Sequence, residues 1–273
     1  TVTGVLGTPG RRLQSVAQAS FDAWIKYYRP DENSPNATIS YYTKGSLVAL
    51  LMDLALREAG GSLDGALRRL WQSSSGGPVD ESNIRQALCD EWQAARPADG
   101  EGSAQAEVGR WFDEWVHGTD ELPLRERLLA FGVRWAGARA SLAQRLGVRA
   151  QDGAAGVRVS HVLAGGAAQA AGLAAGDDIL AVDGWRLARL DDLPRLMPLK
   201  GTARLTVGRD QRLVELRLPP LPPALVDEHR DAIAPASAPG PIGASVSLAL
   251  AETRGTGALA HEVAARRRRW LGA

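Results

Sequence analysis

Side chains that could carry out catalysis are sparse in this chain. Its histidines are His117, His161, His229 and His261, and no two of them stand three or four residues apart. That spacing is what places two zinc ligands on one helical face. His261-Glu262 begins like the zinc motif H-E-x-x-H, but Ala265 occupies the position of the second imidazole. Because one imidazole cannot replace two, we interpret this as a chance resemblance.

Other catalytic signatures are missing as well. The sequence contains no phosphate-binding loop, no dinucleotide fingerprint and no G-x-S-x-G elbow. The single cysteine, Cys89, excludes an intrachain disulfide framework and a cysteine-ligated zinc site. We expect it to be a buried apolar thiol. The sequence therefore predicts no metal site and a chain that is catalytically silent by itself.

Composition excludes several classes of function. The 273 residues leave room for two domains, and 45% hydrophobic with 23% charged residues is typical of soluble globular proteins. A net charge of +1 argues against nucleic acid and anionic membranes as partners. No apolar run reaches the ~20 residues of a bilayer span. A chain that begins at Thr1 without a signal peptide suggests a piece of something longer, and its compartment, cytoplasmic or periplasmic, stays open.

The first ~120 residues read as helices joined by short loops. Apolar residues at helical spacing predict helices over 13–28, Tyr41–Ala59, Leu63–Gln72, from Asp80 to Trp92, and around 108–116. The polar segment Asp31–Asn36 is predicted to be a turn rather than a helix. The tryptophans at helical core spacing are predicted to pack in the core rather than to form a ligand platform; they are Trp24, Trp71, Trp92, Trp111 and Trp115.

The pattern changes near Gly118, where short alternating apolar runs begin to dominate. Predicted strands are Val157–Val162, Ile179–Val182, Ala203–Gly208 and Leu213–Leu218, the last two forming a hairpin. Short helices are expected at Leu124–Ala130 and Leu190–Met197. Beyond Pro219-Pro220 we expect a linker, a strand at Ala244–Leu250 and a final helix at Ala258–Leu271. The predicted class is α+β, with a helical domain at 1–121, a β-rich domain at 122–220, and a linker with a C-terminal strand and helix at 221–273 docking back.

One stretch of the β-rich part resembles a known fold. Residues 156–182 read GVRVSHVLAGGAAQAAGLAAGDDILAV: strand, Gly-Gly turn, short helix, Gly-Leu-x-x-Gly-Asp turn, strand. This order is similar to the core of PDZ domains of the permuted type found on bacterial proteases. The resemblance implies that an extended peptide adds to a strand edge, while its C-terminal carboxylate binds backbone N–H groups of a loop.

The best match to that carboxylate loop is Leu146-Gly147-Val148, preceded by Arg145, which could add positive charge. The other wall of the groove would come from the short helix with Leu193, Leu196 and Met197. The alternative is a PDZ fold that serves only as a docking spacer, with its groove closed or filled by its own chain. The residues leave these two interpretations open.

The helical half resembles the glycyl aminopeptidase family of zinc metallopeptidases. The matching blocks are Phe21-Asp22-Ala23-Trp24, Asp31 to Asn36, Ser40-Tyr41-Tyr42-Thr43-Lys44-Gly45, Trp111-Phe112-Asp113 with Trp115, and Gly118-Thr119. The family combines a thermolysin-like catalytic domain with a following PDZ domain. The resemblance implies that this chain is the second, helical half of such a catalytic domain plus the PDZ domain. The zinc motif and the zinc of the parent protein would belong to a missing N-terminal half, which would be a partner of this chain.

The resemblance also suggests one catalytic residue. Tyr42-Thr43-Lys44-Gly45 matches the Tyr-Glu-Lys-Gly block of related aminopeptidases, whose tyrosine hydroxyl donates to the oxyanion of the tetrahedral intermediate. The alternative is that Tyr42 is a core aromatic at a helix start, and Tyr41 is expected to pack. Asp31, Glu32 and Asn33 could bind a peptide amine, but we favour a solvated turn held by Asx hydrogen bonds.

The sequence thus predicts the C-terminal portion of a zinc metallo-aminopeptidase with a PDZ domain for peptide binding. The competing hypothesis is a non-catalytic PDZ adaptor or structural spacer. Arg266 to Arg269 are interpreted as a solvated face, or as partners of acids on the helical domain, rather than as an RNA site.

Overall fold

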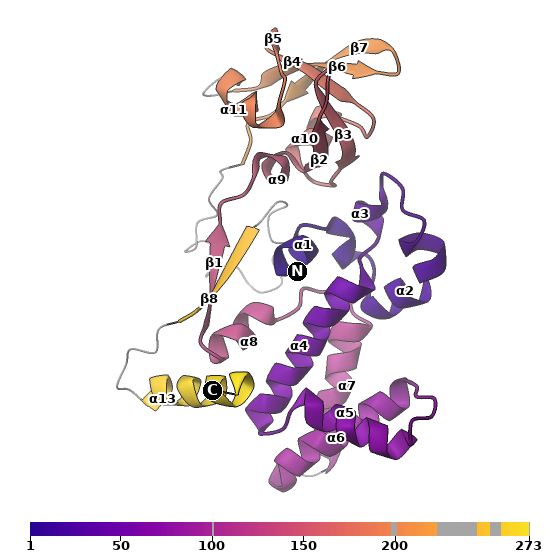
Figure 1. Ribbon diagram of the computed structural model, residues 1–273, viewed down its shortest axis with the longest axis vertical. Coiled ribbons are helices and arrows are strands. Elements are labelled where there is room, and N and C mark those ends of the chain that lie inside the picture. Colours follow the sequence, from indigo (N-terminus) through magenta and orange to yellow (C-terminus); the bar gives the residue numbers. More distant parts are fainter. Residues whose placement is uncertain (100, 198–200, 223–244, 252–257, 273) are drawn as a thin grey trace. The chain divides into compact units, whose positions relative to one another are not determined.

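The computed structural model describes residues 1–99, 101–197, 201–222, 245–251 and 258–272. It is an α+β protein, with a helical N-terminal region followed by an antiparallel sheet, which confirms the predicted class (Figure 1). The chain forms two compact units. Unit 1 comprises Thr1–Gln14, Ala19–Ser40 and Ala136–Ser247, and unit 2 comprises Ser15–Gln18, Tyr41–Trp135 and Leu248–Ala273. The predicted domain boundaries stay a prediction.

Unit 2 is built around the long helix α4, Tyr41–Ala59, whose bounds match the prediction. Leu51, Leu54 and Leu56 are fully buried on it. The other elements of this region are α5 (Leu63–Ser74), α6 (Glu81–Ala95), the 3-10 turn η3 (Pro97–Asp99), α7 (Glu101–Trp111), the π-helix η4 (Phe112–Val116) and α8 (Leu124–Ala130).

Side-chain caps explain why α5 and α6 begin where the sequence predicts. The Ser62 hydroxyl accepts a hydrogen bond from the Gly65 amide at 3.0 Å. Asp80 and Asn83 form a reciprocal capping box at the start of α6. Each cap satisfies amides that have no partner inside the helix.

The final helix, α13 (Ala258–Leu271), contacts α4 within unit 2. Trp270 meets the buried Phe131 edge-on, with ring centroids 5.7 Å apart. Arg57 of α4 donates to the Arg269 carbonyl at 2.8 Å, and Arg266 lies 3.9 Å from Glu58. One arginine of the Arg266–Arg269 run therefore pairs with an acid of the helical region, as expected.

Strands β1 (Val133–Ala138) and β8 (Ser245–Leu250) form a separate two-stranded sheet. Strand β8 confirms the strand predicted at Ala244–Leu250, of which Ala244 lies outside the described residues. Most of the predicted linker, residues 223–244 with His229, also lies outside them.

Unit 1 begins with short helical elements: α1 (Val2–Leu6), the 3-10 turn η1 (Pro9–Arg12), the last part of α2 (Val16–Phe21), the π-helix η2 (Ala23–Tyr27) and α3 (Ser34–Ala37). A Cβ on Gly10 would lie 2.2 Å from the Thr38 carbonyl oxygen, so only glycine allows η1 to approach this backbone.

The rest of unit 1 is a PDZ-like sheet in the order β2-β3-β4-β6-β7, with β5 paired to β4. Its elements are α9 (Leu142–Leu146), β2 (Val148–Asp152), β3 (Val157–Val162), α10 (Ala167–Ala171), β4 (Asp178–Val182), β5 (Trp185–Arg186), η5 (Leu190–Asp192), α11 (Leu193–Leu196), β6 (Ala203–Arg209) and β7 (Arg212–Leu218). Asp210 and Gln211, both with positive φ, form the two-residue turn of the predicted hairpin.

Three expectations about the helical region were wrong. Residues 34–37 of the polar segment form a helical turn, α3, because Ser34 and Pro35 suit its start. Trp24 and Trp71 are 80% and 70% exposed, so they are not core residues. Periodicity places these rings on an apolar face, but it does not show whether another element covers that face. The other three tryptophans are buried as predicted.

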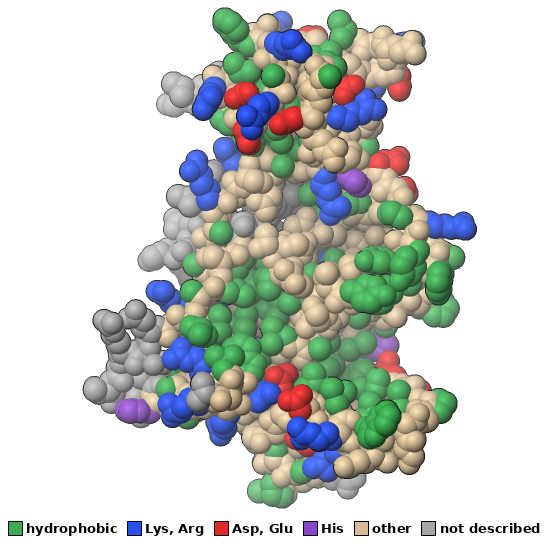
Figure 2. All heavy atoms as spheres, in the orientation of Figure 1, with side chains coloured by type: hydrophobic (Ala, Val, Ile, Leu, Met, Phe, Trp, Pro, Cys, Tyr) green, Lys and Arg blue, Asp and Glu red, His purple; other side chains and the backbone are tan. Residues whose placement is uncertain are grey.

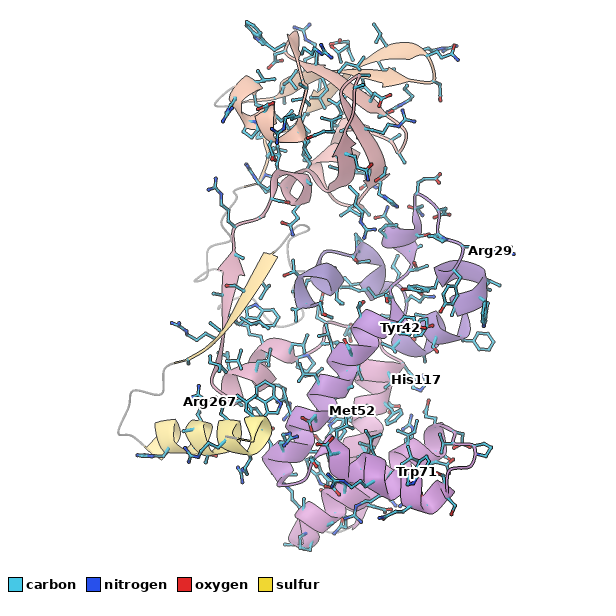
Figure 3. The ribbon with its side chains drawn as sticks, in the orientation of Figure 1. Arg29, Tyr42, Met52, Trp71, His117 and Arg267 are labelled. Carbon is cyan, nitrogen blue, oxygen red and sulfur yellow. The ribbon has the colours of Figure 1, made fainter. Side chains whose placement is uncertain are left out.

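Hydrophobic side chains consequently gather on the surface over α2 and η2 (Figure 2). Phe21 is 90% exposed and Ile25 is 70% exposed there. The Trp24 and Tyr28 rings contact each other at 5.2 Å. Trp71 stands out from α5 in the same manner (Figure 3).

A buried carboxylate holds the turn before β4. Asp177 is fully buried and accepts from two Arg209 nitrogens, each at 2.7 Å. It also accepts from the Ala174 amide at 2.8 Å. The hydrogen bond to Asp177 raises the pKa of Arg209 above its usual value. The two charge-assisted hydrogen bonds of this pair tie the Gly-Asp turn to Arg209 at the end of strand β6.

We predict that Asp177→Ala lowers the free energy of unfolding by about 2 kcal/mol, because it removes the buried acceptor of the Ala174 amide and of the partly exposed Arg209. Urea denaturation measures this. The matched control is the neighbouring Asp178→Ala, which is half-buried and pairs with the exposed Arg158, so a loss of about 1 kcal/mol at most is expected. Equal losses in the two variants would contradict the structural role of Asp177.

Candidate peptide-binding groove

The predicted carboxylate loop follows a short helix whose ends are both fixed by local chemistry. Ser141 and Gln144 form a capping box at the start of α9. Leu142 and Leu146 face the core of the sheet. Gly147 ends the helix in the left-handed conformation, with φ 75° and ψ 49°, which glycine adopts without steric cost. This helix was not predicted from the sequence, because five residues are too few to show helical periodicity.

Gly147 is required for a second reason. A Cβ at this position would lie 2.9 Å from the Gly166 Cα, and a Cβ on Gly166 would lie 2.9 Å from the Leu146 carbonyl oxygen. Two backbone segments therefore touch without side chains between them. The Leu163 amide completes this junction by donating to the Gly147 carbonyl at 2.8 Å.

Strand β2, which follows Gly147, is an edge of the sheet. Val148 faces Val162, and the Leu163-to-Gly147 hydrogen bond makes this a non-hydrogen-bonded pair. The N–H and C=O of Val148 therefore point away from β3, toward the open side of the sheet.

The same holds for the next alternate residues of β2. Ala150 faces Val159, whose own amide and carbonyl bond to the segment before β4, at Asp177 and Gly176. Asp152 faces Val157, next to a hydrogen bond from Gly153 to Gly156. The backbone groups of Val148, Ala150 and Asp152 thus line the open edge in the pattern that an added antiparallel strand needs.

The predicted loop amides are not all at this edge. The Gly147 amide donates to the Ala143 and Gln144 carbonyls, at 2.9 and 3.1 Å, and so caps α9. A carboxylate at this end of the groove would therefore use the Val148 amide. Arg145 is the nearest predicted cation, and its Nε donates to the Pro222 carbonyl at 2.6 Å.

The second predicted wall is formed by η5 and α11. Leu193 is 1% exposed, so its side chain belongs to the core of the sheet and supports the wall from within. Leu196 and Met197 are half-buried and keep surface that a ligand can contact. The side chains of Leu146 and Val148 are also buried in the core. A bound peptide would therefore contact only the backbone of these two residues.

Asp152 ties the two walls together, a role that nothing in the sequence indicated. Its carboxylate accepts from the Leu190 amide at 2.9 Å and lies 3.7 Å from Arg189. The contact joins the end of β2 to the start of η5.

Tyr42 lies in the first turn of α4, in unit 2, and is 57% exposed (Figure 3). Its ring lies 4.2 Å from that of Tyr41, so the two tyrosines pack on each other. Lys44 of the same block is buried. The exposure of the phenol excludes the interpretation of Tyr42 as a core aromatic.

The Asp31–Asn36 segment, in unit 1, combines an Asx turn at Asp31 with the start of the helical turn α3. The Asn33 amide donates to Asp31 at 3.0 Å, an Asx turn, and the Ser34 hydroxyl donates to Asp31 at 2.8 Å. The bond from Ser34 lowers the pKa of Asp31 below its usual value.

No metal centre is formed by the part of the chain that the structure describes, since no three His, Cys, Asp or Glu side chains converge there. His117 pairs with Glu81 at 2.9 Å instead. Cys89 is half-buried, and burial raises the pKa of its thiol. Among the described helices, none combines the length and hydropathy of a bilayer crossing.

Comparisons with known proteins agree with this architecture. Residues 1–48 match the M61 glycyl aminopeptidase family, and residues 138–207 match the PDZ domain family. Comparison with curated proteins gave no match. The chain therefore carries an M61-related segment followed by a PDZ domain.

Among solved structures, an aminopeptidase N family protein from Idiomarina loihiensis is similar in fold, with a TM-score of 0.59 and 22% identity. The match covers 99% of this chain and 42% of that one, so this chain spans less than half of its length. The HtrA3 PDZ domain, solved with a phage-derived ligand, has 18% identity over 33% of this chain and 88% of that one. Its TM-score of 0.25 is too low to support an argument.

We predict that Gly147→Ala destabilises the protein more than Gly184→Ala does. Both glycines have positive φ, 75° and 84°, so both variants lose about 1 kcal/mol to the left-handed backbone. Only at position 147 does the new methyl group meet another backbone, which adds about 1–3 kcal/mol of overpacking. Chemical denaturation of the two variants tests this, and equal losses would show that the Gly147–Gly166 approach has no energetic weight.

Proposed function

We propose that this chain is the C-terminal portion of a zinc metallo-aminopeptidase, and that its PDZ domain binds the C-terminus of an extended peptide. The open edge of β2 is the observation that carries the binding role. It offers alternate outward backbone groups from Val148 to Asp152, beside Arg145 at one end and the half-buried Leu196 and Met197 along the other wall. Peptides that add to such edges gain main-chain hydrogen bonds, and side-chain pockets give selectivity.

The peptidase part of the proposal rests on the M61-related segment and on the fold similarity over nearly the whole chain. The described residues do not fit a zinc site. In the complete enzyme, zinc would supply Lewis acidity. The residues of this chain are given no role in binding that zinc. The chain's own contribution would be the Tyr42 hydroxyl, a neutral donor for the anionic oxygen of a tetrahedral intermediate.

A spacer role is the second candidate, and one contact favours it. Arg145 donates to the Pro222 carbonyl, and Leu221 packs against the core of the PDZ sheet. A segment of the chain itself thus lies beside the predicted carboxylate loop. If that segment holds Arg145 permanently, the domain positions other parts without binding peptides.

We predict that peptides with a free C-terminus bind this chain roughly tenfold to a hundredfold more tightly than their amidated forms, because a charged acceptor strengthens the hydrogen bonds at the loop. Fluorescence anisotropy with a library of paired peptides measures the difference. Ala150→Pro should abolish binding while the sheet stays folded, since the Ala150 N–H faces away from β3.

Ala150→Ser is the matched control, because it retains the backbone donor and nearly the same size. Absence of binding by every peptide pair would instead support the spacer. Binding that is indifferent to amidation and to Ala150→Pro would place the peptide elsewhere on the chain.

We also predict that Tyr42→Phe lowers the kcat of the complete peptidase about a hundredfold, the typical effect of removing one oxyanion donor. Steady-state kinetics with an aminoacyl anilide measures kcat, and Tyr41→Phe serves as the control on the neighbouring ring. Equal kcat values for the two variants would remove Tyr42 from the catalytic machinery.

A further inference from the structure

The side chain of Asn36 joins two segments of unit 1 that are far apart in the sequence. Its Nδ2 donates to the Val162 carbonyl at 2.8 Å, and its Oδ1 accepts from the Ala164 amide at 2.8 Å. The side-chain amide of Asn36 therefore binds both a backbone carbonyl and a backbone N–H group at the end of β3 and in the loop that follows it. Such two-point contact fixes orientation as well as distance.

The turn around Asn36 is organised for this contact. The second Nδ2 hydrogen is directed to Asn33 Oδ1, at 3.0 Å. Asn33 is in turn held by the Asx bond of its amide to Asp31, at 3.0 Å. Asn36 is the third residue of the helical turn α3, so its backbone is fixed as well. Each hydrogen-bonding atom of the Asn36 amide thus has a partner.

The loop that Asn36 holds is the one on which the peptide-binding loop rests. Leu163 lies in this loop, and its backbone amide donates a hydrogen bond to the Gly147 carbonyl at 2.8 Å. Gly166 then touches Gly147 with no side chain between them. A shift of the β3–α10 loop must therefore move Gly147, and with it the outward amide of Val148.

Charged groups of the Asp31–Asn36 turn also act on a histidine of strand β3. Burial lowers the pKa of His161 on β3, and the positive charge of Arg149 on β2 lowers it further. Glu32 and Asp31 of the turn act in the opposite direction and raise that pKa. Two acids of the turn therefore lie within electrostatic reach of the strands that carry the groove.

We propose that Asn36 is a positioning residue for the PDZ groove, which couples occupancy of the peptide site to the conformation of the Asp31–Asn36 turn. Its amide fixes the β3–α10 loop, that loop supports Gly147, and Gly147 sets the edge where the carboxylate binds. This inference rests on the proposed peptide-binding function. Because the turn belongs to the M61-related segment, a peptide captured by the PDZ domain acts on that segment through this contact.

Coupling of this kind is reciprocal. If loss of the Asn36 contact weakens peptide binding, peptide binding must strengthen the contact by the same factor.

The experiment compares the wild-type chain with Asn36→Ala and with Asn33→Ala. The control removes the same type of side chain from the same turn, and the Asn33 side chain bonds to Asn36, whereas the bonds to Val162 and Ala164 come from Asn36 itself. Two readouts are taken: hydrogen exchange of the amides of Val148, Leu163 and Ala164 without peptide, and the Kd of a carboxylate-terminated peptide by anisotropy. We expect Asn36→Ala to speed exchange at these amides and to raise Kd about fivefold, the lower end of typical coupling factors.

A third readout follows the wild-type Asn36 side-chain amide and the turn amides by ¹H–¹⁵N spectroscopy during peptide titration. Shifts with the carboxylate form and not with the amidated form support the coupling, and a merely structural role of Asn36 would not produce them. Unchanged exchange in Asn36→Ala overturns the proposal. If no peptide binds the wild type, the proposed function fails, whereas faster exchange at Val148 in Asn36→Ala still supports the positioning role of Asn36.

Discussion

The groove depends on one steric constraint, the direct approach of two backbone segments at Gly147 and Gly166. No side chain separates them, so the end of α9, the start of β2 and the start of α10 meet at one point. Glycine at both positions makes this approach possible, and the left-handed conformation of Gly147 turns the chain from helix into edge strand. The direction of the free hydrogen-bonding groups of β2 follows from this turn. A side chain at either glycine would collide with backbone atoms rather than with other side chains, and would therefore displace strand β2 itself.

The chain divides its chemistry between its two units. Unit 1 combines the PDZ sheet with the Asp31–Asn36 turn, and unit 2 carries Tyr42 at the start of a long buried helix. The peptide recognition proposed for unit 1 uses backbone groups, which tolerate many peptide sequences. In the proposed function Tyr42 of unit 2 supplies a hydrogen-bond donor, and the described part of the chain forms no cluster of metal ligands. Under that proposal this chain orients a substrate, and other residues of the complete enzyme cleave the bond.

Local signals predicted much of this structure from the sequence. The bounds of α4, α8, β3 and α13 match the prediction because apolar periodicity and turn residues agree there. The caps at Ser62 and Asp80 were also visible, since capping needs only neighbouring residues. What could not be predicted depends on contacts between distant segments. Periodicity did not reveal that Trp24 and Trp71 are exposed, and no local signal linked Asn36 to Val162 or Asp152 to Leu190.

The aromatic surface over η2 has a consequence for the behaviour of the chain in solution. The side chains of Phe21, Trp24 and Ile25 are exposed to water. Each square ångström of such apolar surface costs about 25 cal/mol of free energy relative to the same surface buried. Any neighbour that excludes this water lowers that free energy, whether it is a folded protein, a chaperone or an unfolded segment. Exposed apolar side chains that lie next to one another promote association, so a neighbour that covers Phe21, Trp24 and Ile25 lowers the tendency of this polypeptide to aggregate.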